Sequence, residues 1–347
     1  MKTIVLGAII LLALSGRVPA STRLDLNNDW QFRTDPEQKG ETANWQKKPP
    51  SGTASINVPH TWNLGRHDGY LGKAWYFRTF ELPVQSPDLH VELHFGATFY
   101  SSRVWLNGTE IGTHEGGYTA YSFNITPHLQ QTNYLAVELD NRIGASTIPG
   151  FANRGEDKSW YDWWDYGGIV RDVWLTVGSP IQVTRQQIRS QVNAVGAIVQ
   201  DRIFLENNLK QTAKLTMTAT ALGPDNQPAV HESQSLELSP GEKDAAISLN
   251  LTDPKLWSID NPNIYRMVVQ ITDAEGKNLD EQSDTFGLRT VEIRDRHLFV
   301  NGERVRLTGV TRHEESAGEG LAETPGTMRD DYDDMKALQV TLTLEAL

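Results

Sequence analysis

Hydrophobic and polar residues alternate along most of the chain after its first twenty positions. Clear series occupy residues 89–95, 135–139 and 173–177. A period of two predicts strands with one buried face and one wetter face. The dipeptide Asn107-Gly108 separates two further apolar runs. Both of its residues tolerate positive φ, so we expect a β-hairpin there.

A break near residues 178–180 (GSP) divides these strands into two sets. Three further alternating series follow the break, at residues 215–219, 245–251 and 265–271. About a hundred residues of short strands is typical of a small immunoglobulin-like sandwich, which we expect over residues 180–287. The first unit is longer and fits a jelly-roll sandwich over residues 22–178.

The pattern changes again after residue 287. A hairpin over residues 298–307 leads into a strand at 309–314, and a helix follows with apolar positions at Met328, Tyr332, Met335 and Leu338. Thr327 is the expected N-cap of this helix. Residues 340–347 form another apolar run. Strand, helix and strand open a β/α repeat, so residues 288–347 are expected to begin a (β/α)8 barrel that is truncated here.

The N-terminus has the three parts of a secretory signal peptide. Lys2 precedes an apolar run over residues 4–14, and small residues lead to Ala20. This order predicts a signal peptide over residues 1–20, with cleavage after Ala20. The run is too short to span a bilayer. We therefore expect a secreted or periplasmic protein with no membrane segment after cleavage.

Charge and cysteine content narrow the possible functions. The chain has 347 residues and a formal net charge of −12, which opposes binding to nucleic acid and to anionic lipid. It contains no cysteine. Disulfides, thiolate metal sites and a cysteine nucleophile are thereby excluded.

An unusual density of aromatic rings and carboxylates precedes the strand at 173–177. Residues 159–175 read SWYDWWDYGGIVRDVWL. Such rings either fill a hydrophobic core or form a wall against a ligand. The residues alone leave both alternatives open.

Five motifs occur in order along the chain, and together they resemble glycoside hydrolase family 2. They are VPHTWN at 58–63, VWLNG at 104–108, YGGIVRDV at 166–173, LWSIDNPNIY at 256–265 and GVTRHE at 309–314. This family includes β-galactosidases, β-glucuronidases and β-mannosidases. The resemblance implies a sugar-binding jelly roll, an immunoglobulin-like sandwich and a TIM barrel that carries the catalysis.

The resemblance also implies a set of substrate-binding residues. In similar enzymes, the aspartate at the position of Asp162 reaches from the jelly roll into the active site and binds sugar hydroxyls. Trp163 would offer a flat apolar face to the sugar, or fill the seam between jelly roll and barrel. His313 and Glu314 end the first barrel strand, where they would contact sugar or form a structural hydrogen bond. Arg171 is expected to pair with a carboxylate at the rim of the sandwich.

The same family places its two catalytic glutamates on later barrel strands. Retention of anomeric configuration needs two carboxylates about 5–5.5 Å apart, one as nucleophile and one as acid/base. No segment of residues 338–347 matches the family at this point, so we assign no catalytic residue. We also assign no metal ligand and no cofactor, although full-length relatives can hold sodium or magnesium.

Two functions of different classes remain. The first is a secreted retaining β-glycosidase that hydrolyses terminal β-linked sugars, a β-galactosidase or β-glucuronidase, of which this chain is a fragment inactive by itself. The second is a non-catalytic carbohydrate-binding or assembly module of two sandwiches. Both take a carbohydrate as partner, either a β-galactoside or a β-glucuronide. The sequence gives no oligomeric state.

Overall fold

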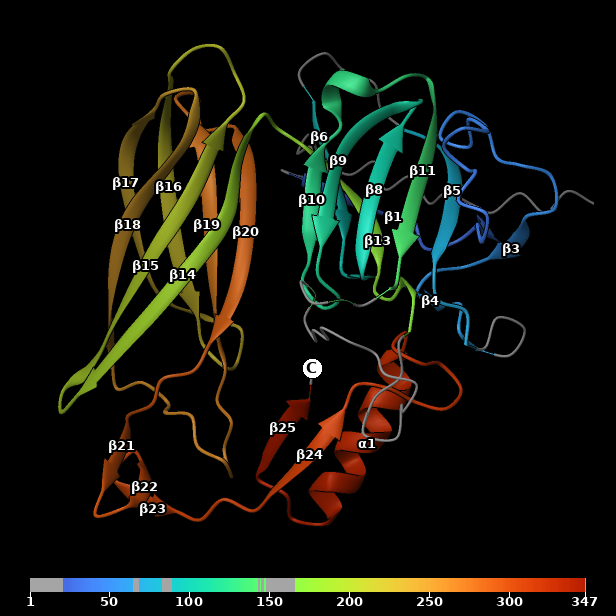
Figure 1. The fold of residues 1–347 in the computed structure, drawn as a ribbon. Helices are drawn as coiled ribbons and strands as arrows, with labels where there is room; N and C mark the ends of the chain where they lie inside the picture. The colour runs from blue at the N-terminus through green and yellow to red at the C-terminus, as the bar shows by residue number, and fades with distance from the viewer. Residues whose placement is uncertain are drawn as a thin grey trace, which may run out of the picture.

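The computed structural model describes residues 21–64, 69–82, 89–142, 144, 147 and 166–346. Two β-sandwiches lie side by side, and a smaller unit with the single labelled helix lies below them (Figure 1). The expected mostly β chain, with a jelly roll, an immunoglobulin-like sandwich and the first β/α unit of a barrel, is confirmed.

The first sandwich is built from three antiparallel sheets. Their strand orders are β1-β13-β6-β10, β3-β2-β5-β11-β8-β9 and β4-β12-β7. The strands are β1 (Ser21–Asp25), β2 (Trp30–Thr34), β3 (Ala54–Ile56), β4 (His60–Thr61), β5 (Lys73–Glu81), β6 (His90–Phe95), β7 (Thr98–Phe99), β8 (Ser101–Leu106), β9 (Thr109–Glu115), β10 (Tyr121–Asn124), β11 (Thr132–Asp140), β12 (Gly168–Ile169) and β13 (Val173–Gly178). A 3-10 turn spans Thr126–His128. The first and last strands pair, with Ser21 opposite Gly178.

Two layers of aromatic residues stabilise the jelly roll. The main core lies between the large sheets and includes Trp30, Trp62 and Tyr76. A second cluster holds Trp75 and Trp105, whose rings stack 5.1 Å apart. The indole N–H of Trp75 donates a hydrogen bond to the buried Asp35 carboxylate at 3.2 Å. The polar atom of this buried ring therefore has a hydrogen-bond partner.

The second sandwich has sheet orders β14-β15-β18 and β17-β16-β19-β20. Its strands are β14 (Ile181–Asn193), β15 (Gly196–Asn207), β16 (Ala213–Leu222), β17 (Pro228–Leu238), β18 (Gly241–Thr252), β19 (Tyr265–Asp273) and β20 (Asn278–Phe286). Alternate residues of these strands point inward and form a separate hydrophobic core. Each sandwich therefore has an interior of its own, as independent domains do.

One buried carboxylate in this second sandwich lowers stability at neutral pH. Asp201 is 0% exposed, and its Oδ2 has no hydrogen-bond partner among the described residues. Burial raises the pKa of Asp201 to about 6, the nearby charge of Asp284 adds to this, and the Gln187 N–H opposes it. A native pKa above the unfolded value favours folding below pH 4, and this contribution is lost as pH rises through about 6.

We expect Asp201→Asn to raise the free energy of unfolding at pH 7 by about 1–2 kcal/mol, because the amide carries no charge to bury. The gain should vanish near pH 4, because Asp201 of the wild-type protein is then protonated and, like the asparagine, carries no charge. Urea unfolding at the two pH values measures it. The exposed Asp260→Asn serves as the control. An equal gain at both pH values would contradict the titration argument.

The third unit begins with a small hairpin sheet and continues with a strand–helix–strand motif. The sheet contains β21 (Val291–Arg294), β22 (His297–Val300) and β23 (Glu303–Val305). The motif contains β24 (Gly309–His313), α1 (Pro325–Ala337) and β25 (Leu342–Ala346). The two strands run parallel, with Gly309 opposite Leu342 and His313 opposite Ala346, as in a β/α repeat.

The N-cap of α1 differs from the sequence prediction. The N-cap is Thr324 rather than Thr327, and the Thr324 side chain accepts a hydrogen bond from the Thr327 N–H. Pro325 suits the first helical position because it has no N–H to satisfy there. No residue of α1 is buried, and Leu338, directly after the helix, is 75% exposed.

Candidate functional site

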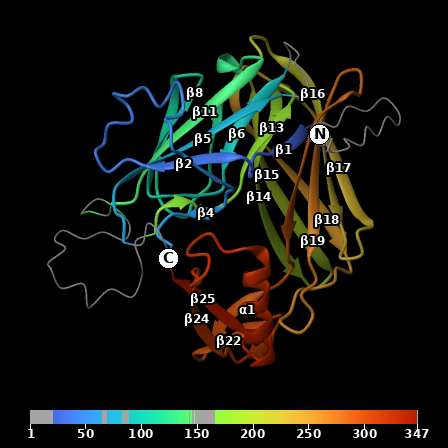
Figure 2. The same ribbon diagram turned by 90° about the vertical axis from the view of Figure 1, so that its right-hand side faces the viewer.

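The C-terminal ends of β24 and β25 point toward the jelly roll. Their arrowheads face its lower edge in Figure 1, and in the turned view of Figure 2 the unit with β24, β25 and α1 again lies below the jelly roll. In barrels of this type, active sites form at the C-terminal ends of the strands. The seam between the jelly roll and the segment after β24 is therefore the candidate functional site.

Leu321 anchors this segment in the seam through apolar packing. It is 7% exposed and clusters with jelly-roll residues Ala97, Phe99, Tyr100 and Val170. The half-buried Tyr166 packs against the same cluster, in agreement with the interpretation that some rings of the aromatic stretch fill the seam.

Gly320 marks the closest approach of the segment to the jelly roll. Its φ is +58°, a left-handed value that favours glycine. An added Cβ would lie 2.8 Å from the Thr61 methyl group and 2.9 Å from the Tyr166 ring. A larger residue would push the segment away from the seam.

Arg171 joins the two parts by polar contacts. Its Nη2 donates to Glu314 Oε2 at 2.5 Å, and its Nη1 donates to the Leu321 carbonyl at 2.7 Å. The carboxylate expected for Arg171 is thus Glu314, which belongs to the barrel unit and not to the sandwich. The Glu314 carboxylate therefore already has a partner in Arg171. The predicted direct contact between Glu314 and sugar stays a prediction.

Alternation along β24 separates its side chains into two sets. Arg312 is buried on the α1 side, where it bonds to Asp331 of α1 and to Glu323. Successive residues of a strand point to opposite faces. Thr311 and the exposed His313 therefore face away from α1, toward the interior that a barrel would enclose.

Tyr118 is a residue of the seam that sequence reasoning missed. It lies in the β9–β10 turn and meets the Phe99 ring edge-on, with centroids 5.9 Å apart. Burial raises the pKa of Tyr118, and the charges of Glu315 and Glu314 add to the effect. The available signal in the sequence was the Gly116-Gly117 pair before it, which favours a turn. In the structure a Cβ on Gly117 would lie 2.3 Å from the Phe99 ring.

Asp162 and Trp163 lie outside the described residues, as do their neighbours from 148 to 165. Their assignment as sugar contacts therefore stays a prediction. His60 and Trp62 pack inside the jelly roll, and the His60 Nδ1 lies 2.8 Å from the Tyr76 hydroxyl.

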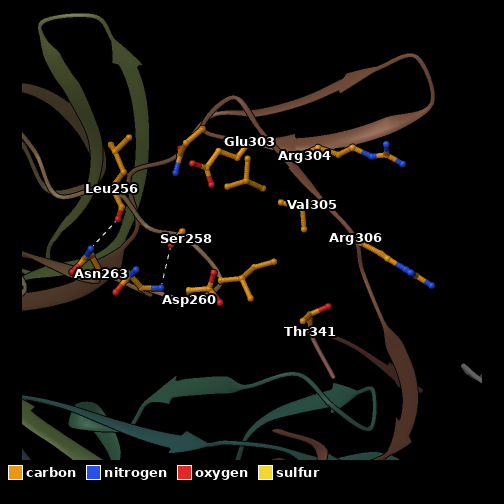
Figure 3. Close-up of a pocket in the computed structure, with 13 residues that line it drawn as sticks. Leu256, Ser258, Asp260, Asn263, Glu303, Arg304, Val305, Arg306 and Thr341 are labelled. Carbon is orange, nitrogen blue, oxygen red and sulfur yellow. Dashed lines mark hydrogen bonds between the residues drawn. The ribbon is translucent and has the colours of Figure 1, made fainter. Parts of the chain in front are cut away.

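A cleft of about 630 Å³ occurs elsewhere, beside the small hairpin sheet. Figure 3 shows Leu256 and Asn263 of the second sandwich on one side and Glu303 to Arg306 on the other. Thr341 also lines it and accepts the Thr308 N–H at the start of β24. The cleft is thus at the N-terminal end of the barrel strands, opposite to the end where sites of this fold form.

In the part of the chain that the structure describes, no group of three or more histidine, aspartate or glutamate side chains is arranged to hold a metal ion. The one α-helix of that part, α1, has 13 residues. No described helix is long and apolar enough to cross a membrane.

Three consecutive profiles of one family match the chain. The family 2 sugar-binding domain of the glycosyl hydrolases matches residues 68–179, the central family 2 domain matches 181–289, and the family 2 TIM barrel domain matches 291–342. The chain belongs to glycoside hydrolase family 2. The seam is therefore the junction between the sugar-binding domain and the first strand of the family 2 barrel.

The chain is also similar to individual proteins named β-glucuronidase and β-galactosidase. A β-glucuronidase of Formosa agariphila is 25% identical over 344 residues, covering 89% of this chain and 34% of its own length. A β-galactosidase of Thermoanaerobacter pseudethanolicus is 25% identical, covering 90% of this chain and 42% of its own length. The chain thus spans about a third to two fifths of these relatives.

Solved structures give the same result. A putative β-galactosidase from Bacteroides fragilis superposes with a TM-score of 0.84 at 28% identity, covering 94% of this chain and 50% of that one. β-Glucuronidase 2 of Bacteroides uniformis, covalently bound to cyclophellitol-6-carboxylate aziridine, gives 0.82 at 27% identity, covering 93% and 39%.

Proposed function

We propose that this chain supplies the non-catalytic walls of the sugar site in a secreted retaining β-glycosidase that acts on terminal β-glucuronides or β-galactosides. The observation that carries the proposal is the seam, where Arg171 of the sugar-binding domain donates a hydrogen bond to Glu314 at the end of the first barrel strand. Relatives named β-glucuronidase and β-galactosidase support the two substrate classes.

Three glutamates near β24 already have structural partners. Glu314 is paired with Arg171, Glu323 is buried against Arg312, and Glu319 accepts hydrogen bonds from Thr324 and Thr327. A retaining mechanism needs a nucleophile and an acid/base about 5–5.5 Å apart around the sugar. We propose that neither catalytic carboxylate is one of these three glutamates and that both come from outside residues 21–347.

Residues 21–347 alone are expected to give no turnover of 4-nitrophenyl β-glucuronide or β-galactoside above the buffer rate. Turnover that survives purification and disappears in an Arg171 variant would overturn the assignment of the catalytic pair. Expression with residues 1–20 attached tests the proposed export in the same preparation. An intact mass that begins at Ser21 in the extracellular or periplasmic fraction is the expected result.

Calorimetry with glucuronate and galactose separates this proposal from a non-catalytic carbohydrate-binding module. A module has to bind sugar with its own residues, whereas a wall of a larger site binds weakly without the opposite wall. Millimolar or weaker affinity is expected. Micromolar affinity that persists after His313→Ala would favour the module.

A further inference from the structure

Arg171 occupies a position where its backbone is fixed by the jelly roll. It lies between β12 and β13, and the neighbouring Gly96 N–H donates to the Asp172 carbonyl at 2.8 Å. A Cβ on Gly96 would lie 2.6 Å from the Arg171 Cβ. The two segments therefore lie directly against each other, which fixes the point from which the Arg171 side chain extends to the seam.

One guanidinium holds both ends of the segment that follows β24. Glu314 is the first residue after the strand, and Leu321 comes seven positions later, yet both accept from Arg171. The side chains of Arg171 and Glu314 are 29% and 27% exposed, so the pair is largely shielded from water. A planar guanidinium can donate to two acceptors in different directions at the same time and in a fixed geometry. A lysine ammonium is a point charge on a flexible side chain and does not fix two acceptors in this way.

The apolar contact of Leu321 and the polar contact of Arg171 have separable effects. Burial of Leu321 favours docking of the segment but has no directional preference. The hydrogen bond from Arg171, in contrast, is directional and fixes the position of Glu314. Glu314 directly follows His313, so this bond also restrains His313. Loss of Arg171 should therefore leave the segment docked while releasing its first residues.

We propose that Arg171 is a positioning residue for the sugar site. It fixes the segment 314–321 on the rim of the jelly roll and, through Glu314, the presentation of His313 at the end of β24. The link to sugar rests on the function proposed above. The clamp itself concerns contacts within residues 21–347 and is testable without any turnover.

The test compares Arg171→Met, Arg171→Lys and Glu314→Gln in the full chain. Arg23→Met is the matched control, since Arg23 belongs to the same sandwich and pairs with Asp172 without contacting the segment. Cleavage by a glutamate-specific protease after Glu315 reports release of the first residues of the segment. Removal of a charge-assisted, partly buried contact should accelerate cleavage about tenfold in Arg171→Met and Glu314→Gln, with Arg23→Met unchanged.

A second readout distinguishes positioning from simple docking. The imidazole resonance of His313, assigned by its loss in His313→Gln, should shift in Arg171→Met and in Arg171→Lys but not in Arg23→Met. If the Arg171 variants do not fold, Glu314→Gln decides alone, because it changes no jelly-roll residue. Cleavage within about twofold of wild type, or an unmoved His313 resonance, would overturn the clamp.

Sugar calorimetry on the same variants separates failure of the clamp from failure of the proposed function. Weaker binding in Arg171→Met than in Arg23→Met, together with faster cleavage, supports both. Faster cleavage with sugar binding unchanged supports the clamp and removes its role in the sugar site.

Discussion

Replacing Arg312 by methionine is expected to unfold the β24–α1–β25 unit while both sandwiches stay folded. The Arg312 and Glu323 side chains are 7% and 1% exposed, and their atoms meet at 2.7 Å. The variant leaves the Glu323 carboxylate buried without its counter-charge. Removing one partner of a buried pair costs about 3–5 kcal/mol, which a unit this small cannot offset.

Hydrogen exchange gives the direct measurement for Arg312→Met. The α1 amides should lose their protection, whereas amides of β5, β11 and β15 should keep theirs, because each sandwich has a separate core. Arg329→Met is the matched control, since Arg329 is an exposed residue of α1. Protected α1 amides in Arg312→Met would refute the role of the buried pair.

A second large effect is expected from Gly168→Ala. A Cβ at Gly168 would lie 1.9 Å from the His60 carbonyl oxygen. This oxygen belongs to the backbone of β4, which pairs with β12, so it cannot rotate away as a side chain would. Overpacking of this kind places the cost near the upper end of the usual range, about 3 kcal/mol.

The jelly-roll transition should move down by roughly 6–12 °C in Gly168→Ala, given a domain of this size. Differential scanning calorimetry measures it, and the second sandwich serves as an internal reference. Gly318→Ala is the control, because no atom lies within 4 Å of a Cβ built there. If Gly168→Ala lowered the jelly-roll transition temperature no more than Gly318→Ala does, the prediction would be wrong, and β4 and β12 would be able to move apart at little cost.

Local patterns predicted the strands and hairpins because the signals are themselves local. Asn107 and Gly108 have φ of 53° and 82°, the positive values that the hairpin prediction required. Asn301 and Gly302 repeat this turn, with φ of 52° and 80°. In β5 the buried and exposed positions do not alternate, because residues 74–77 are all buried. The second aromatic layer covers the outer face of the sheet there.

The candidate site was harder to predict, since its contacts join distant parts of the chain. Glu314 was singled out as a sugar contact and Arg171 as a structural residue, but no period or spacing connects positions 143 residues apart. The approach of Gly320 to Thr61 is equally non-local. The N-cap at Thr324 was missed for a local reason, because Pro325 was not recognised as the first helical residue.

The pairing of β1 with β13 sets the order in which the protein can assemble during synthesis. Ser21 lies opposite Gly178, so the first strand has no partner until the last strand of the same sandwich has left the ribosome. Pairing of such distant strands is slow to form, and an unpaired strand edge promotes association. We expect β1 to be the most chaperone-dependent segment of the nascent chain.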